Sequence, residues 1–335
     1  TNEPKGVIIN EKSYIHVARI LTQKFKQTKN DRELLSMPLF HSFGLARLRC
    51  VILAKSSALI TDGLSRLPEI FKLSQKTKIT GISLVPSAII ILKNLLRKRI
   101  TELSVNLKYF EIGSSAINDE LRKWLKDNFK KTIIIHHFGM TEASRSFLRY
   151  RGKLDNLNIP NNWVGEPING CDFKLINIKK DKRLKITVGE LVIRGQNLYS
   201  GYLNIKKFNK NSWFKTGDLC SLENNKVRLI GRKDNEFNIG GYKVQAEFIE
   251  KIIEEIKYVK SCVCFRSKDK ELGDQINCVI DLKFKDKLNL CRKELNNKFN
   301  EFPSYYKPKK IVFHDVLKTE NGKKIRNFNI DELSN

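Results

Sequence analysis

Short apolar runs alternate with amphipathic segments along the first half of the chain, a pattern typical of a parallel sheet covered by helices. Four runs are filled almost continuously by β-branched and other apolar residues, as strands buried on both faces are. They span residues 34–39, 81–85, 107–112 and 132–136. The pattern therefore predicts an α/β fold for this half of the chain.

Two of the intervening helices carry recognisable end signals. One has Pro86 in its first turn, where proline is tolerated, and continues through apolar positions to Leu96. The other follows Asn118, a favourable N-cap, and has Asp119 and Glu120 in the first turn, where the helix dipole favours negative charge. Each predicted helix has one apolar face for packing on the sheet.

The pattern changes between residues 163 and 230, where β-strands such as 171–176 and 190–193 are separated by glycine-containing turns. After residues 231–234 we expect a hairpin around residues 240–241, a helix, strands, a helix and a strand. This last unit has a size, about 100 residues, that folds alone. We predict a large domain over 1–231, a hinge at 232–234 and a small α+β domain over 235–335.

Composition indicates a globular protein, because 41% of the 335 residues are hydrophobic and 30% are charged. The most apolar stretch, residues 82–96, is too short and too interrupted for a membrane-spanning helix of about 20 residues. The seven cysteines show no C-x-x-C spacing and do not group with the five histidines, which argues against disulfides and a zinc site. We expect a soluble protein in a reducing cytoplasm.

The net charge of +27 raises the question of a polyanionic partner. Lysines are scattered along the whole chain, however, and no segment combines basic and aromatic residues as RNA-binding modules do. We therefore expect no nucleic-acid partner.

Four short motifs could carry chemistry, and each has a plainer reading. Residues 136–142 could place an aromatic ring, a hydroxyl and a Mg²⁺-binding carboxylate beyond a strand end, or could cap a helix and fill its first turn. Asp218 could accept hydrogen bonds from ribose hydroxyls or simply form a turn. Lys5 beside Gly6 could contact phosphate, and Lys323 beside Gly322 could do so or belong to a basic tail.

Taken together in order and spacing, these motifs resemble the adenylate-forming, AMP-binding superfamily of acyl-CoA synthetases, peptide-synthetase adenylation domains and luciferases. The matching segments are residues 1–7, 38–45, 113–116, 138–142, 189–202, 216–218, 231–234 and 322–323. The resemblance implies a large α/β domain with parallel sheets, helices and a β-rich subdomain, followed by a small mobile lid. Because residues 1–7 look like only the end of the phosphate-binding loop, we expect an upstream part of the large domain.

The resemblance also implies a role for each matching residue. Lys323, Thr141 and Glu142 would be catalytic, Glu142 would bind Mg²⁺, and Asp234 would be the hinge about which the lid rotates. His41 would border the acid pocket, although a histidine there is as often a structural hydrogen-bonding group. Gly240 and Gly241 would line a pantetheine tunnel, a role compatible with a plain hairpin turn. The nucleotide would contact Lys5, Gly113, Ser114, Ser115, Ala116, His137, Phe138, Gly139, Met140, Asp218 and Arg232.

The activity that the resemblance implies is ligation of a carboxylic acid to a thiol, through an acyl-adenylate made from ATP with Mg²⁺. Amino-acid adenylation domains have an aspartate in the acid-pocket motif, whereas this chain has Phe40, His41 and Ser42, which favours another acid. We expect a fatty acid first and an aryl acid second, with coenzyme A as acceptor. The alternatives are a ligase that loads an acyl carrier protein and an inactive nucleotide-binding remnant.

Overall fold

The computed structural model describes residues 5–61, 63, 67–114, 116–150, 156, 158–181, 186–204, 208–209, 211–239, 242–269, 273–317 and 324–326. The chain divides into two compact units. The first comprises Thr1–Ile176, Val192–Thr216 and Leu222–Arg228, and the second Asn177–Leu191, Gly217–Ser221 and Leu229–Asn335. A hinge at 232–234 and domain limits on either side of it stay predictions.

The first unit is built on a seven-stranded sheet in which β3, β2, β4, β5 and β6 run parallel and β7 and β8 complete one edge antiparallel. In spatial order the strands are β3 (Ser57–Ile60), β2 (Arg32–Leu35), β4 (Gly81–Leu84), β5 (Tyr109–Ile112), β6 (Ile133–Met140), β7 (Ala143–Tyr150) and β8 (Glu166–Pro167). This sheet confirms the α/β fold predicted for the first half of the chain.

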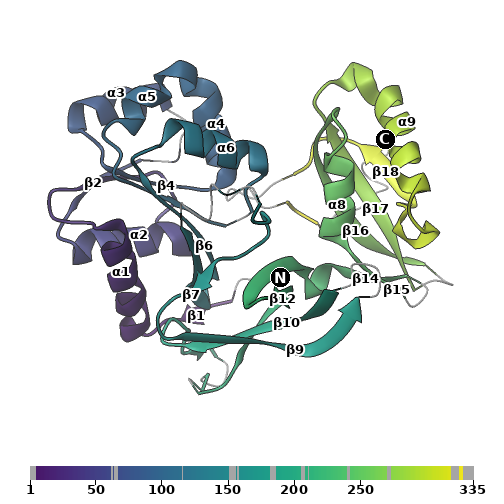
Figure 1. Ribbon diagram of the computed structural model, residues 1–335, viewed down its shortest axis with the longest axis horizontal. Helices are drawn as coiled ribbons and strands as arrows, with labels where there is room; N and C mark the ends of the chain where they lie inside the picture. The colour runs from purple at the N-terminus through teal and green to yellow at the C-terminus, as the bar shows by residue number, and fades with distance from the viewer. Residues whose placement is uncertain are drawn as a thin grey trace. The chain divides into compact units, whose positions relative to one another are not determined.

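Helices cover both faces of this sheet (Figure 1). One face carries α3 (Leu67–Thr77), α4 (Pro86–Leu96), α5 (Ile100–Ser104) and α6 (Asp119–Asn128), with a 3-10 turn at Arg97–Arg99, and the other carries α1 (Glu11–Phe25) and α2 (Ser42–Leu53). Buried side chains of α3 to α6, including Phe71, Leu92 and Leu125, form one hydrophobic core with strand residues such as Ile82 and Phe110. Burial of this continuous apolar surface stabilises the unit.

Local end signals gave the helix bounds correctly. The helix α4 starts at Pro86 in the first helical position, and Asn118 caps α6 by accepting a hydrogen bond from the amide N of Leu121 at 2.8 Å. The strand expected over residues 34–39 is placed wrongly, because β2 already ends at Leu35 and the chain then turns through Pro38 to begin α2 at Ser42. A proline cannot donate a ladder hydrogen bond, which disfavours continuing the strand.

The β-rich region contains a four-stranded sheet in the order β13 (Lys226–Arg232), β12 (Phe214–Glu223), β10 (Ile186–Gly195) and β9 (Cys171–Asp181). The division between the two units passes through these strands. A separate pair joins β1 (Val7–Ile8) and β11 (Gly201–Tyr202) antiparallel. The expected strands at 171–176 and 190–193 are confirmed, and both are longer than predicted.

The C-terminal part of the second unit has the expected order of hairpin, helix, strands, helix and strand. A 3-10 turn at Lys233–Asn235 precedes β14 (Glu236–Ile239) and β15 (Tyr242–Gln245), and α8 (Ala246–Glu254), β16 (Val259–Asp269), β17 (Gly273–Leu282), α9 (Leu288–Asn300) and β18 (Lys310–Phe313) follow, with 3-10 turns at Lys285–Lys287 and Ser304–Tyr306. The sheet order is β15-β14-β17-β16, and β18 lies parallel beside β17. Side chains of α8 and α9 pack with this sheet in one core.

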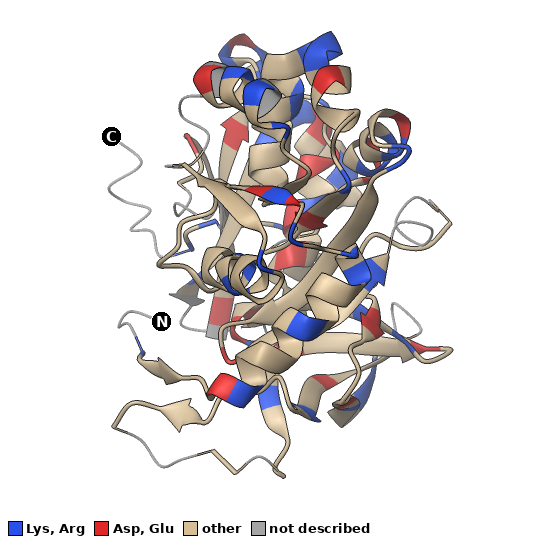
Figure 2. Ribbon diagram, turned by 90° about the vertical axis from the view of Figure 1, so that its left-hand side faces the viewer, with Lys and Arg blue, Asp and Glu red and all other residues tan. Residues whose placement is uncertain are grey.

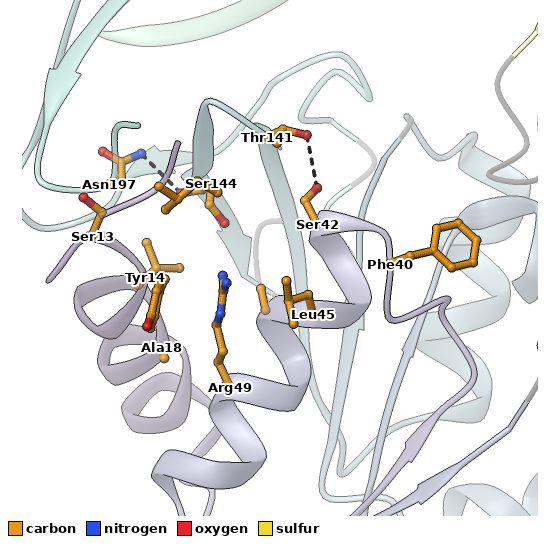
Figure 3. Close-up of a pocket in the computed structure, with 13 residues that line it drawn as sticks. Ser13, Tyr14, Ala18, Phe40, Ser42, Leu45, Arg49, Thr141, Ser144 and Asn197 are labelled. Atoms are coloured by element: carbon orange, nitrogen blue, oxygen red, sulfur yellow. Dashed lines mark hydrogen bonds between the residues drawn. The ribbon is translucent and has the colours of Figure 1, made fainter. Parts of the chain in front are cut away.

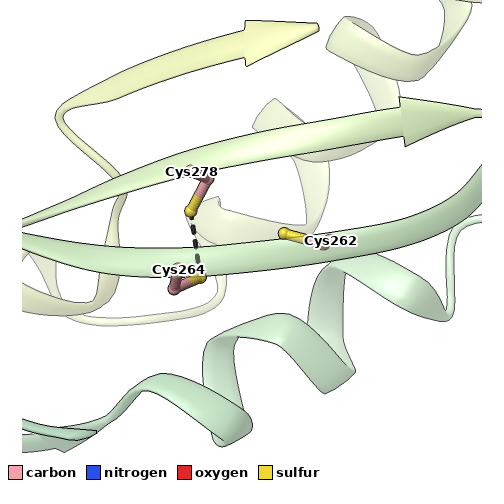
Figure 4. Close-up of side chains that lie close together, drawn as sticks. All are labelled: Cys262, Cys264 and Cys278. Atoms are coloured by element: carbon pink, nitrogen blue, oxygen red, sulfur yellow. Dashed lines mark hydrogen bonds between the residues drawn. The ribbon is translucent and has the colours of Figure 1, made fainter. Parts of the chain in front are cut away.

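Three cysteines meet in that core although they are not adjacent in sequence (Figure 4). Cys264 lies opposite Cys278 in the antiparallel pairing of β16 and β17, and their sulfur atoms are 3.0 Å apart. Cys262 lies two residues away on the same face of β16, and the three sulfur atoms lie within 4.8 Å of one another. Burial raises the pKa of the Cys262 and Cys264 thiols, so these side chains act as small apolar groups of the core.

Basic and acidic side chains are interspersed along the helices and strands (Figure 2). Many form pairs of opposite charge, such as Lys93 with Glu120 and Lys298 with Glu255. No helix among the described residues is long and apolar enough to cross a membrane. Location in the cytoplasm stays a prediction.

Candidate functional site

Thr141 and Glu142 form the two-residue turn of the hairpin that joins β6 to β7. The strand β6 continues to Met140, which pairs with Ala143, the first residue of β7. Two expectations are therefore wrong: the strand does not end at residue 136, and the motif does not begin a helix. The partner of residues 137–140 is the distant antiparallel strand, which local sequence signals do not reveal. The turn is exposed at Thr141, whose hydroxyl donates to Ser42 Oγ at 3.4 Å.

The Glu142 carboxylate is held by a tyrosine from another strand. Tyr202 in β11 donates its hydroxyl to Glu142 Oε1 at 2.8 Å, and the amide N of Tyr199 donates to the Glu142 carbonyl oxygen at 2.8 Å. Burial and the acceptor role of Glu142 raise the pKa of Tyr202, so the phenol stays a donor. Lys5 Nζ lies 5.7 Å from the centre of the Tyr202 ring. The structure thus brings Lys5 and Glu142 close to the same tyrosine, a residue that sequence reasoning missed.

Gly113, directly after β5, lies against His137, which is within β6. A Cβ on Gly113 would be 2.1 Å from His137 Cε1, so only glycine permits this approach. His137 Nδ1 lies 2.7 Å from the buried Glu111 carboxylate. Burial and the charge of Arg145 lower the pKa of His137, which keeps the imidazole neutral. Gly113 and the Glu111 carboxylate therefore together set the position of the ring.

A buried ion network fixes the base of this site. Arg145 Nε lies 3.0 Å from Glu111 Oε1, and Arg47 bridges Glu33 at 2.6 Å and Glu111 at 3.4 Å. The neighbouring cations hold the pKa of Glu111 well below its usual range, against the effect of burial. Sequence reasoning missed the network. Its charged residues come from four separate helices and strands, and a local sequence pattern does not show that they meet.

The other residues predicted around the nucleotide are placed less closely together. Phe138 is half-buried and packs edge-on against Phe147 at 5.9 Å between ring centres, and Gly139 and Met140 complete β6. Ser114 has a left-handed backbone with φ of 77°, and Ala116 is exposed. Their contact with a nucleotide stays a prediction.

His41 is the N-cap of α2. Its Nδ1 accepts a hydrogen bond from the amide N of Phe43 at 3.3 Å. This is the structural hydrogen-bonding role that the sequence left open beside a role in the acid pocket. The pocket role stays a prediction.

A cavity of about 150 Å³ lies beside the hairpin turn, between α1 and α2 (Figure 3). Thr141 and Ser42 lie at one side of it, and Arg49 extends from α2 between Tyr14 and Leu45. Its remaining walls combine apolar and hydroxyl side chains. They are Ile9, Ser13, Val17, Ala18, Phe40, Ala46, Ser144 and Asn197.

In the second unit, Asp218 and Arg232 form the predicted ribose-binding pair. Arg232 donates to Asp218 Oδ1 at 2.9 Å, and the aspartate side chain is only 6% exposed whereas the arginine is 43% exposed. Gly217 has a φ of 73°, and its Cα faces the Arg232 guanidinium, which a Cβ would approach to 3.1 Å. The turn before Asp218 therefore depends on glycine both for its backbone conformation and for space.

The expected hinge and lysine segment are only partly within the described residues. The carbonyl oxygen of Asp234 accepts a hydrogen bond from Arg266 at 2.9 Å, and the neighbouring Lys233 lies 3.2 Å from the buried Glu190. Ser115, Gly240, Gly241 and Lys323 lie outside the described residues. Lys324, directly after the expected catalytic lysine, pairs with Glu250 at 3.1 Å and Glu254 at 2.7 Å.

The described geometry can be compared with known proteins. The family model of the AMP-binding enzymes matches residues 1–203, more than half of the chain. The chain belongs to this family. Among the curated AMP-binding relatives, an acyl-CoA synthetase of Alternaria alternata is 25% identical, over 97% of this chain and 62% of its own length. A 2-succinylbenzoate–CoA ligase of Enterococcus faecalis is 24% identical, over 96% of this chain and 66% of its own length.

Solved structures agree with this assignment at the level of the fold. An o-succinylbenzoate CoA synthetase from Bacillus subtilis, in complex with its acyl-adenylate intermediate, superposes with a TM-score of 0.80 at 21% identity, over 97% of this chain and 66% of that one. The predicted fold of the adenylate-forming superfamily is thus confirmed. The chain spans less than two thirds of the length of the first curated AMP-binding relatives that it matches.

Proposed function

We propose that this chain belongs to an acid–thiol ligase, which converts a carboxylic acid into an acyl-adenylate with ATP and then into a thioester with coenzyme A. Relatives named as CoA ligases support this activity. The observation that carries the proposal is the hairpin turn, in which Thr141 lines a small cavity and the next residue, Glu142, supplies a carboxylate. A hydroxyl, a carboxylate and a neighbouring acid site are what adenylation needs.

The chemical problem is that a carboxylate has no adequate leaving group. In the proposed first step a carboxylate oxygen attacks the α-phosphorus of ATP, and the bond to pyrophosphate breaks. The phosphoryl oxygens carry dispersed negative charge in the transition state, so positioning and electrostatic stabilisation provide the catalysis. In the second step the thiolate attacks the acyl carbon and AMP leaves.

Glu142 suits the Mg²⁺ that ATP brings. Oε1 already accepts from Tyr202, while among the described residues Oε2 has no donor, and a single carboxylate with substrate phosphates is the usual Mg²⁺ ligand set. Mg²⁺ bound there would neutralise phosphate charge. Thr141 is exposed and its hydroxyl makes only a long contact of 3.4 Å with Ser42, so it is available to phosphate.

Asp218 and Arg232 are proposed to fix the nucleotide ribose. A buried carboxylate accepts two vicinal hydroxyls well, and Arg232 orients it through an ion pair of 2.9 Å. Lys323 is proposed as the cation between acid and α-phosphate.

The test is pyrophosphate release with a panel of carboxylic acids, and trapping of the acyl group by hydroxylamine. We expect Lys323→Ala and Glu142→Gln each to lower the rate at least about 100-fold, as loss of one stabilising group at a developing charge does. Lys293→Ala, which removes an exposed lysine from α9, is the matched control and should change it less than twofold. Equal rates for Lys323→Ala and wild type would remove the lysine from the mechanism.

The same assay separates the remaining alternatives. AMP formation that depends on coenzyme A supports the proposal, whereas dependence on a phosphopantetheinyl carrier protein supports a carrier-loading ligase. Release with free amino acids would contradict the interpretation of residues 40–42. Binding of ATP without pyrophosphate release for any acid would indicate a nucleotide-binding remnant.

A further inference from the structure

The cavity between α1 and α2 contains a guanidinium that is not explained by the folding of the unit. Arg49 lies in the last part of α2 and is partly buried, and its guanidinium carbon is 3.9 Å from the centre of the Tyr14 ring. Within the described part of the chain, no carboxylate pairs with it. The neighbouring Arg47 and Arg145, by contrast, are each engaged by buried glutamates.

The surroundings of Arg49 favour an anionic ligand. Burial lowers the pKa of Arg49 most, and the charge of Arg145 lowers it further, whereas Tyr14 acts in the opposite direction. Two guanidiniums near one cavity, with only one of them paired, leave a local excess of positive charge. Guanidinium is suited to bidentate binding of a carboxylate, and stacking on Tyr14 fixes its plane.

The cavity also limits the size of the ligand. A cavity of about 150 Å³ holds a molecule of roughly benzene size. The Thr141 and Ser42 hydroxyls lie at its boundary, and Thr141 is the group proposed to contact phosphate. An acid with its reacting carboxylate near Thr141 and a second charge near Arg49 would be short, with only a few carbon atoms between its two ends, given that volume.

Resting on the proposed ligase function, we infer that the acid is a short dicarboxylic acid, and that Arg49 binds its second carboxylate and selects it over monocarboxylic acids of equal length. Arg49 is then a specificity-determining residue. A long fatty acid, the first expectation from the sequence, does not suit this cavity. The distant carboxylate takes no part in bond formation, so Arg49 acts on binding of the acid.

The experiment compares glutaric acid with its monomethyl ester and with valeric acid, which have similar length but one charge. Binding is measured by calorimetry without ATP, and turnover by pyrophosphate release. We expect wild type to bind and use glutaric acid at least about tenfold better than either monoacid, the size of one charge-assisted hydrogen bond. Arg49→Gln should remove this preference by raising KM for glutaric acid while kcat stays within about twofold.

Two further variants keep the result interpretable. Arg49→Lys retains the positive charge but lacks the planar guanidinium that binds a carboxylate through two hydrogen bonds, so it should keep part of the preference. Arg19→Gln removes an exposed arginine from the neighbouring α1 and should leave the preference unchanged. All variants are compared by thermal unfolding, which detects a misfolded Arg49→Gln protein. In that case the substrate preference of Arg49→Lys decides whether Arg49 selects the acid.

The outcomes separate this inference from the proposed function. Pyrophosphate release with equal preference for glutaric acid and its monomethyl ester overturns the inference and leaves the ligase standing. An Arg49-dependent binding preference without pyrophosphate release supports the site and contradicts the ligase. If neither an Arg49-dependent preference nor pyrophosphate release is observed, the inference and the proposed ligase function are both contradicted. Inorganic pyrophosphate is tested as well, and Arg49-dependent binding of pyrophosphate alone would assign the guanidinium to the leaving group and overturn the inference.

Discussion

The His137 imidazole lies directly on the Cα of Gly113, with no room between them for a methyl group. The ring cannot turn away freely, because Nδ1 lies 2.7 Å from Glu111, which Arg145 and Arg47 hold in turn. The end of β5 is thereby fixed against the middle of β6, whose last residues lead into the hairpin turn. This contact links the conformation of the candidate site to the buried ion network below it.

Replacing Gly113 by alanine should therefore cost stability and disturb the hairpin. The added Cβ would lie 2.4 Å from His137 Nε2, so the ring or the strand must move. We expect a loss of about 1–3 kcal/mol in the free energy of unfolding, as for other overpacked sites. Urea unfolding measures this loss. A stable Gly113→Ala protein would show that the imidazole is not held.

The lowered pKa of His137 predicts a pH dependence of stability. The unfolded chain binds a proton at this imidazole near its ordinary value of 6.5, whereas the folded chain binds it only at lower pH. The unfolded state therefore gains protons first as the pH falls below 6.5, and stability decreases. The depressed pKa of Glu111 predicts a further loss of stability at lower pH, below the ordinary carboxyl value of 4.5, because protonation removes the ion pairs of Glu111.

Urea unfolding between about pH 5 and pH 8 tests this sign. His137→Gln retains a donor for Glu111 but does not titrate, and its stability should vary less between pH 6.5 and about pH 5 than that of the wild type. His314→Gln, at an exposed position in the second unit, should keep the wild-type slope. If the stability of the wild type and of His137→Gln changes equally with pH, folding does not lower the pKa of the His137 imidazole.

The Asp218–Arg232 pair predicts a specific defect in nucleotide binding. Asp218→Asn leaves the shape but removes the charge-assisted acceptor, so ATP should bind about 10-fold to 100-fold more weakly. Calorimetry with 2′-deoxy-ATP and 3′-deoxy-ATP makes the test sharp. An analogue that lacks a hydroxyl bound by Asp218 should bind more weakly than ATP to the wild type, but about as tightly as ATP to the Asp218→Asn variant. Asp172→Asn breaks a similar pair with Arg194, also at 2.9 Å but exposed, and should leave ATP binding unchanged.

The elements that sequence reasoning placed well depend on local chemistry. Pro86 and Asn118 set helix starts through their own backbone and side chain, and the glycine pair at 240–241 indicated the hairpin of β14 and β15. The end of β6 was misplaced because residues 137–140 are strand only by virtue of β7, which follows after the turn. A local apolar pattern does not contain that pairing.

The candidate site shows the same limit. Thr141, Glu142, Asp218 and Arg232 were named from motifs, and the structure places each pair as neighbours. Tyr202 and Arg49 were missed, because a tyrosine in a short strand and an arginine in a helix have many ordinary roles. The resemblance supplied residues that are similar throughout the superfamily, whereas these two depend on contacts between elements far apart in the sequence.

The contacts of Glu250 predict how firmly residues 324–326 are attached to the second unit. This buried glutamate, 5% exposed, pairs with Lys324 and Arg326, and its Oε1 also accepts from the amide N of Cys264 at 2.7 Å. Arg326 in turn donates to the Cys264 carbonyl oxygen at 2.8 Å. Residues 324–326 are thereby bound at once to α8 and to the outer edge of β16. Removal of the glutamate charge leaves two partly buried cations without their main partner.

Glu250→Gln should therefore destabilise the second unit by about 3–5 kcal/mol, the usual cost of breaking a buried pair on one side. Glu255→Gln is the matched control, because Glu255 pairs with Lys298 at a similar 2.7 Å on the surface and should cost less than about 1 kcal/mol. Hydrogen exchange resolves where the change occurs. Faster exchange at the amide of Ile325, which donates to the Leu317 carbonyl oxygen at 3.0 Å, would report detachment of residues 324–326, and unchanged exchange there would contradict the anchoring role.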